Sequence, residues 1–209
     1  MAIEVFNRYE KKYIIDEDTF HKLTCQIADY MNPDAYNRNG EAYRISNIYY
    51  DTENDQLIRA SIEKSIYKEK LRLRAYGTPE LTDNVFVEIK KKYNGIVNKR
   101  RTSMTLQEAY DFIDDDMCPD GHEGRINRQV LKEIDYFKNF YHLQPKVYLS
   151  YDRFAYFEKD DGDFRITFDK NITTRREDVR LEHGSYGKKL LPDGQYLMEV
   201  KISGAVPLW

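Results

Sequence analysis

The stretch LMEVKIS at residues 197–203 alternates apolar and charged residues along what we predict to be a β-strand. Successive side chains of an extended chain point to opposite faces of a sheet. Glu199 and Lys201 therefore share one face, and the apolar residues around them share the other. A half-buried strand with a solvated face explains one such segment, but the chain repeats the pattern.

The unit Glu-x-Lys occurs three times, at residues 10–12, 88–90 and 199–201. When the other predicted strands are sorted by parity, one face collects many more cations than carboxylates, although the whole chain has a formal net charge of -3. The members of this face are Arg8, Glu10, Lys12, Arg72, Arg74, Glu88, Lys90, Lys99, Arg101, Tyr151, Arg153, Arg165, Glu199 and Lys201. Ordinary solvent-exposed surface mixes the two signs, so this segregation points to a specific site.

The predicted elements indicate an α+β fold with about eight mostly antiparallel strands, enough to close a β-barrel with helices packed on the outside. We expect strands at residues 5–15, 42–52, 67–77, 84–95, 96–104, 145–158, 163–169 and 195–203, with a further extended segment near 172–182. We expect helices at residues 16–31, 54–65, 106–113 and 125–141. Two arrangements of such a barrel are open: an apolar core with charges outside, or a polar tunnel with an apolar exterior.

Composition narrows the class of protein. The 209 residues are consistent with one domain, 1–209, and no linker or low-complexity tract divides them. The slightly negative net charge argues against nucleic-acid binding. No signal peptide or transmembrane run is present, and Cys25 and Cys118 have no metal-type spacing, so we expect a cytoplasmic protein with reduced thiols.

A tunnel lined by Arg and Lys repels itself unless an anion occupies it. Guanidinium groups match phosphate oxygens in pairs, and Lys supplies a compact charge. The sparse glutamates are then candidate ligands for Mg²⁺ or Mn²⁺, which prefer oxygen and bridge to phosphate. The residues alone leave two alternatives open, a polyanion tunnel and a solvated sheet face.

The same segments carry a family resemblance. RYEKKYII, IYYDT, LRLR, VFVEIKKK, YDR-x-AY, FRITFD and MEVK-x-SG-x-x-P-x-W follow one another over almost the whole chain. In this order they resemble the VTC domain, the polyphosphate polymerase domain of the vacuolar transporter chaperone family. That family belongs to the triphosphate tunnel metalloenzymes and also occurs as stand-alone bacterial proteins.

The resemblance implies an eight-stranded antiparallel tunnel that transfers the γ-phosphate of ATP onto inorganic polyphosphate with Mn²⁺ or Mg²⁺. It implies catalytic roles along the phosphate path for Lys12, Arg72, Arg74, Lys90, Lys99, Arg153, Arg165 and Lys201. Tyr151, with Arg8 and Arg101 of the same charged face, would bind ATP or phosphate, and Glu199, Glu88 and Glu10 would bind the metal. Pyrophosphate or triphosphate are further expected ligands, and a membrane partner for product export is an open expectation.

Phosphoryl transfer needs positioning and charge neutralisation more than covalent chemistry. The attacking phosphate oxygen is already anionic, so no general base is required, and the four histidines are scattered.

Three alternatives stay open at this point. A triphosphate hydrolase or cyclase of the same superfamily typically begins with Glu-x-Glu-x-Lys, whereas this chain has Arg8 in the first position. A catalytically silent polyphosphate-binding module is the second, and a binder of single-stranded nucleic acid is the third. Family members usually continue into a helix with a Ser-Lys-Tyr motif, whereas this sequence ends at Trp209, so we expect that it either is truncated or lacks this tail. In both cases the tunnel is expected to persist, and full polymerase activity stays an open question.

Overall fold

The computed structural model describes residues 5–6, 9–37, 39–119, 126–159 and 164–202. Its centre is one antiparallel sheet in which eight long strands follow the order β7-β6-β5-β4-β8-β9-β11-β2. These strands are β2 (Tyr9–Asp16), β4 (Tyr43–Asp51), β5 (Tyr67–Tyr76), β6 (Asn84–Tyr93), β7 (Ile96–Thr105), β8 (Gln144–Glu158), β9 (Arg165–Arg175) and β11 (Gln195–Ile202). The predicted α+β class and the antiparallel eight-strand arrangement are confirmed.

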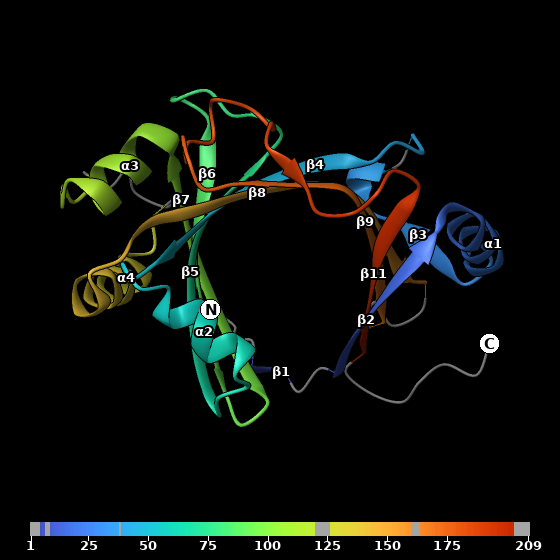
Figure 1. Cartoon of the computed structure of the whole chain (residues 1–209), viewed down its shortest axis with the longest axis horizontal. Coiled ribbons are helices and arrows are strands. Elements are labelled where there is room, and N and C mark those ends of the chain that lie inside the picture. The colour runs from blue at the N-terminus through green and yellow to red at the C-terminus, as the bar shows by residue number, and fades with distance from the viewer. Residues whose placement is uncertain (1–4, 7–8, 38, 120–125, 160–163, 203–209) are drawn as a thin grey trace.

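Three short strands complete the sheet. β1 (Val5–Phe6) pairs with β7, β3 (Met31–Pro33) with β8, and β10 (Lys188–Lys189) with β9. β1 and β2 are neighbours in the chain, yet they pair with strands at opposite ends of the sheet order. Figure 1 shows the strands curving around a common centre, with β1 between the β5 side and β2. The N-terminal segment thus joins the two ends of the sheet, and the described residues form no ladder between β2 and β7.

The β6–β7 hairpin illustrates how local sequence sets the register. Tyr93 pairs with Ile96, and Asn94 and Gly95 between them have φ angles of 45° and 90°. A two-residue turn with positive φ at both positions is the one that matches strand twist, and Asn-Gly is its preferred sequence. This turn places Glu88 opposite Arg101 and Lys90 opposite Lys99.

The helices lie outside the sheet and cover its apolar face. α1 (Glu17–Ile27) packs Phe20 and Ile27 against the outer face of β9 and β11. α3 (Leu106–Asp114) and α4 (Arg128–Tyr141) cover the other side, where they share a larger core with β4 to β8. α2 (Gln56–Ile62) and the 3-10 helix η1 (Ala35–Asn37) are short connections. The sheet therefore buries its apolar face outward, under helices (Figure 1).

The predicted extended segment near 172–182 is wrong beyond residue 175. Residues 172–175 finish β9, and residues 176–187 form a loop. Arg175 organises this loop, because its guanidinium donates hydrogen bonds to four backbone carbonyls of residues 178–186 and lies 3.6 Å from the Tyr148 ring centroid. In the part of the chain that the structure describes, no helix is long and apolar enough to span a lipid bilayer.

Candidate functional site

The inward faces of all eight long strands line a cavity of about 680 Å³. Because side chains alternate along a strand, the face opposite the helix-covered one supplies the lining. Ten cations and four carboxylates lie in it, an excess of six positive charges: Lys12, Lys70, Arg72, Arg74, Lys90, Lys99, Arg101, Arg153, Arg165 and Lys201 against Glu10, Glu88, Asp169 and Glu199. Of the two arrangements that the sequence left open, the structure has the polar interior.

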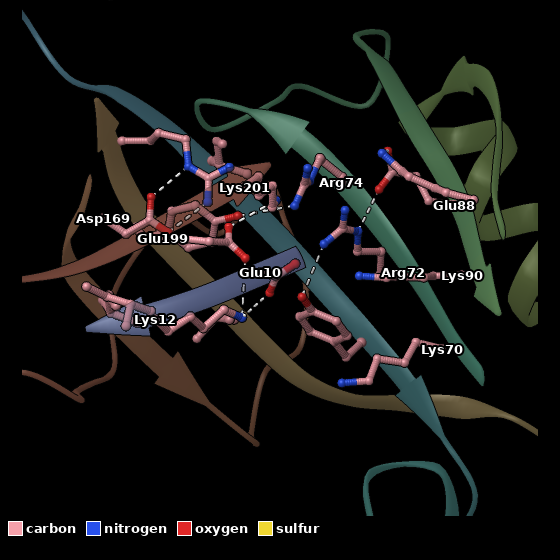
Figure 2. A pocket seen from close by; sticks show the side chains of 18 of the residues that line it. Glu10, Lys12, Lys70, Arg72, Arg74, Glu88, Lys90, Asp169, Glu199 and Lys201 are labelled. Atoms are coloured by element: carbon pink, nitrogen blue, oxygen red, sulfur yellow. Dashed lines mark hydrogen bonds and ion pairs between the residues drawn. The ribbon is translucent and has the colours of Figure 1, made fainter. Parts of the chain in front are cut away.

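Every described member of the predicted site set lines this one cavity, from Glu10 on β2 to Lys201 on β11. Arg8 lies outside the described residues. Figure 2 shows the side chains of several strands converging, with Glu10, Lys12, Glu199 and Lys201 in one group and Arg72, Lys90 and Glu88 in another. Their individual roles in binding and catalysis stay predictions.

Glu199 is the centre of the first group. On β11 it pairs in register with Lys12 of β2, and Lys201 pairs with Glu10. The Glu199 carboxylate lies 3.4 Å from Lys12 Nζ and 3.0 Å from Lys201 Nζ, and Lys12 Nζ is 2.9 Å from Glu10 Oε1. Two Glu-x-Lys units on adjacent antiparallel strands therefore interleave their charges.

The surroundings of Glu199 keep its carboxylate ionised. Burial alone would raise the pKa of Glu199, but the positive charges of Lys201 and Lys12 outweigh burial and hold the pKa well below its usual value. An ionised, partly desolvated carboxylate is a good ligand for a hard divalent cation.

Glu10 and Glu199 fit a metal site, whereas Glu88 does not join them. The described residues contain no group of three or more His, Cys, Asp or Glu that could hold a metal ion. Two neighbouring carboxylates match the way proteins hold Mg²⁺, with one or two carboxylates and the remaining positions left for water and phosphate. Glu10 and Glu199 are therefore the best-placed candidate ligands, and the metal-binding role of Glu88 stays a prediction.

Glu88 lies in the second group, on β6, where it is 1% exposed. Its two oxygens lie 2.6 Å from Arg72 Nε and 2.7 Å from Lys99 Nζ. Burial would raise the pKa of Glu88, but Arg72 and Lys99 overcome it and lower the pKa to about 2. The geometry is that of a counter-charge that holds two cavity cations in place.

Asp169 was missed by the sequence analysis, although it shares the parity of Arg165 and Thr167 on β9. It accepts two hydrogen bonds from Arg153, at 2.6 and 2.7 Å. Lys70 was missed in the same way, two residues before Arg72 on β5. Extending the parity rule by one position at each strand would have found both.

Five cavity cations have no carboxylate partner among the described residues: Lys70, Arg74, Lys90, Arg101 and Arg165. Arg74 instead donates to Asn47 and Tyr151, at 2.9 and 3.1 Å. The Nε atom of Arg165 is buried without a hydrogen-bond partner. Burial lowers the pKa of Lys70, Lys90 and Arg165, and nearby cations add to this effect. Carboxylates such as Glu10 and Glu199 raise the pKa of Lys90 but do not offset the decrease. This part of the cavity is short of negative charge.

One part of the lining is apolar, which the sequence did not suggest. Ile45, Tyr151 and Ile172 form a buried cluster to which Leu149, Leu191 and Leu197 add. Leu191 comes from the segment between β10 and β11 rather than from a strand. The charged groups are thus bounded on one side by a largely apolar surface.

We expect the buried Glu88 to leave a signature in acid unfolding. Because its pKa is lower in the folded chain than the ordinary value of 4.5, its contribution is complete above about pH 4.5 and is lost as the pH falls towards 2. The lowered pKa corresponds to about 3 kcal/mol of unfolding free energy. Urea unfolding between pH 6 and 2.5 should show a steeper loss of stability in wild type than in Glu88→Gln; parallel curves would contradict the expectation.

Comparison with known families gives one match over nearly all of the chain. The family model described as the VTC domain matches residues 7–209. Vacuolar transporter chaperone complex subunit 4 of Schizosaccharomyces pombe is 27% identical over 209 aligned residues, which cover 88% of this chain. The chain spans 28% of the length of that relative.

Solved structures share the fold at low sequence identity. A putative adenylate cyclase from Bacillus halodurans has a TM-score of 0.54 at 15% identity, covering 95% of this chain and 83% of its own. A putative adenylyl cyclase from Hippeastrum, described as having a dominant triphosphatase activity, has a TM-score of 0.50 at 13% identity, covering 94% of this chain and 79% of its own. Each similarity extends along most of both chains.

Proposed function

Since the chain belongs to the VTC domain family, we propose that it is a metal-dependent polyphosphate polymerase that transfers the γ-phosphate of ATP to inorganic polyphosphate. The observation that carries the proposal is the set of five cavity cations without carboxylate partners. Buried positive charges are costly unless they are paired, and a polyphosphate segment supplies closely spaced negative charges. The cavity has the volume of roughly twenty water molecules.

In this mechanism the cavity cations position two phosphates and neutralise their charge. A terminal phosphate oxygen of the growing chain attacks the γ-phosphorus of ATP, the bond to the β,γ-bridging oxygen breaks, and ADP leaves. Arg74, held by Asn47 and Tyr151, and Arg165 bring guanidinium groups to the cavity that can donate to the equatorial oxygens. The attacking oxygen carries no proton, so no residue has to act as a base.

Glu10 and Glu199 are the residues that would hold a divalent cation, and such a cation would supply positive charge that stabilises the charge developing on the phosphates during transfer. Lys12 and Lys201 hold these carboxylates toward the cavity. Mg²⁺ and Mn²⁺ both prefer oxygen ligands, so the two carboxylates are compatible with either ion.

A triphosphate hydrolase is the alternative. A gel that resolves polyphosphate separates the two after incubation with ATP and Mn²⁺ or Mg²⁺, with and without pyrophosphate or triphosphate as primer. Chains that lengthen with time support the polymerase. Release of phosphate from tripolyphosphate without lengthening would support the hydrolase, and tight binding without turnover would indicate a binding module. A cytoplasmic setting and a membrane partner stay predictions.

Arg165→Met is expected to weaken tripolyphosphate binding without lowering the stability of the free protein. Charge-assisted hydrogen bonds are worth about 1.5–3 kcal/mol, so tripolyphosphate should bind about 10- to 100-fold more weakly. The free protein should unfold at the same or a higher temperature, because the variant removes a charge with no carboxylate partner among the described residues. Calorimetric titration and thermal unfolding measure both quantities.

Arg100→Met is the matched control for this experiment. Arg100 lies on β7 outside the cavity lining and pairs with Glu133 of α4. Its loss should leave tripolyphosphate affinity unchanged. Equal affinity losses in the two variants would mean that total charge, rather than the cavity, governs binding.

A further inference from the structure

A group of aromatic rings lies at the rim of the cavity beside its cations. Tyr43 and Tyr76 line the cavity, and Tyr36 of η1 stands against both, at ring-centroid distances of 5.5 and 5.6 Å. Tyr76 also meets Phe86 edge-on, and the Arg101 guanidinium lies 4.7 Å from the centroid of the Phe86 ring. A continuous series of ring contacts thus extends from Tyr36, in the connection before β4, to Arg101 in the cavity.

The outermost rings of this group remain in water. Tyr36 is 67% exposed and Tyr76 is 44% exposed, although the two rings lie almost parallel, at 11°. An aromatic pair packed for stability would bury most of its surface. This pair keeps flat apolar area available at the rim.

The segment that presents Tyr36 is firmly anchored. The side chain of Asn37, 3% exposed, donates to the carbonyls of Glu41 and Arg153 and accepts from the amide of Ala155. Asp34 accepts hydrogen bonds from the Tyr36 amide and the Tyr43 hydroxyl, both at 3.3 Å. These hydrogen bonds fix the backbone that carries the exposed Tyr36 ring, which lowers the entropy cost of stacking on it.

Strand pairing also places these aromatic residues next to the cavity residues that are predicted to bind phosphate. Tyr43 pairs in register with Arg153, and Ile45 pairs with Tyr76 on one side and Tyr151 on the other. A ligand that places phosphates on Arg153 and Arg165 therefore has an aromatic surface next to it, at the rim.

We propose that the base of a nucleoside triphosphate stacks on Tyr36 and Tyr76 while its triphosphate enters the cavity. The inference rests on the proposed function for the triphosphate site and adds a separate site for the base. It fixes the orientation of the bound nucleotide, with the nucleoside at the aromatic rim and the triphosphate inside the cavity. Stacking suits any base with a π-face, and the extended ring system of a purine offers the larger contact.

The test compares two ligands that share a triphosphate and differ in the base. Affinities for the β,γ-imido analogue of ATP and for inorganic tripolyphosphate are measured by calorimetry with Mg²⁺. Tyr36→Ala should weaken nucleotide binding about tenfold, the effect of losing one base-stacking contact, and leave tripolyphosphate binding within about twofold. Tyr36→Trp should restore nucleotide binding, and Tyr76→Leu should repeat the selective loss.

Tyr136→Ala is the matched control, because Tyr136 is 66% exposed and stacks on Phe140 of α4, outside the cavity lining. It should change neither affinity. Unchanged nucleotide binding in Tyr36→Ala, or an equal loss for both ligands, would overturn the base site. If wild type binds the nucleotide selectively but makes no polyphosphate, the polymerase proposal fails and the base site stands. If it binds neither ligand, both fail.

Discussion

Replacing Glu199 with glutamine is expected to reduce polyphosphate synthesis from ATP by at least about 100-fold, the usual scale for loss of one group that stabilises charge in a transition state. Glutamine keeps the size of the side chain and removes its negative charge. Lys12 and Lys201 then lose the carboxylate that lies within 3.4 and 3.0 Å of them, and the proposed metal loses one of two ligands. A gel that resolves chain length, with ATP and Mn²⁺, measures the loss.

Glu69→Gln is the matched control for a buried, lysine-paired carboxylate. Glu69 is 7% exposed, as Glu199 is, and lies 3.5 Å from Lys91, but it is absent from the cavity lining. Its replacement should lower stability and leave the amount of polymer per folded protein unchanged. Direct titration with Mn²⁺ should show weaker binding in Glu199→Gln only. Unimpaired synthesis in Glu199→Gln would remove Glu199 from the site.

Much of the fold and the site could be predicted because strand periodicity is a local property. The alternation in LMEVKIS assigns Glu199 and Lys201 to one face whatever the rest of the chain does, and the structure puts both in the cavity. The Asn94-Gly95 turn is local too, and it sets the β6–β7 register. The choice of the inward face was not local, because it depends on helices that cover the opposite face.

The partners of each charge could not be predicted, since they depend on the sheet order. Glu88 and Glu199 have the same Glu-x-Lys context in the sequence. Pairing of β6 with β5 and β7 puts Glu88 opposite Arg72 and Arg101 and within reach of the Lys99 side chain. Pairing of β11 with β2 puts Glu199 next to Glu10 and Lys12. Two identical motifs thus acquire different surroundings. The same reasoning explains why Tyr36, outside the predicted strands, was not singled out.

Replacing Glu88 with glutamine is therefore expected to destabilise the protein and to leave metal binding unchanged, in contrast to the change at Glu199. Removing one partner of a buried ion pair usually costs about 3–5 kcal/mol, and here two cations, Arg72 and Lys99, lose their counter-charge. Thermal unfolding should show a large loss of stability in the ligand-free variant. Mn²⁺ affinity should stay at the wild-type value, because Glu88 lies apart from the Glu10–Glu199 pair (Figure 2).

Polyphosphate should rescue this variant. A ligand that binds only the folded state stabilises it by an amount that grows with its affinity, and the variant cavity has one more uncompensated positive charge. Tripolyphosphate should therefore raise the unfolding temperature of Glu88→Gln more than that of wild type, while Glu69→Gln should gain no more than wild type. If Glu88→Gln instead lost Mn²⁺ affinity and gained nothing extra from tripolyphosphate, Glu88 would be a metal ligand as the sequence suggested, and its ion pairs with Arg72 and Lys99 would have to open when the metal binds.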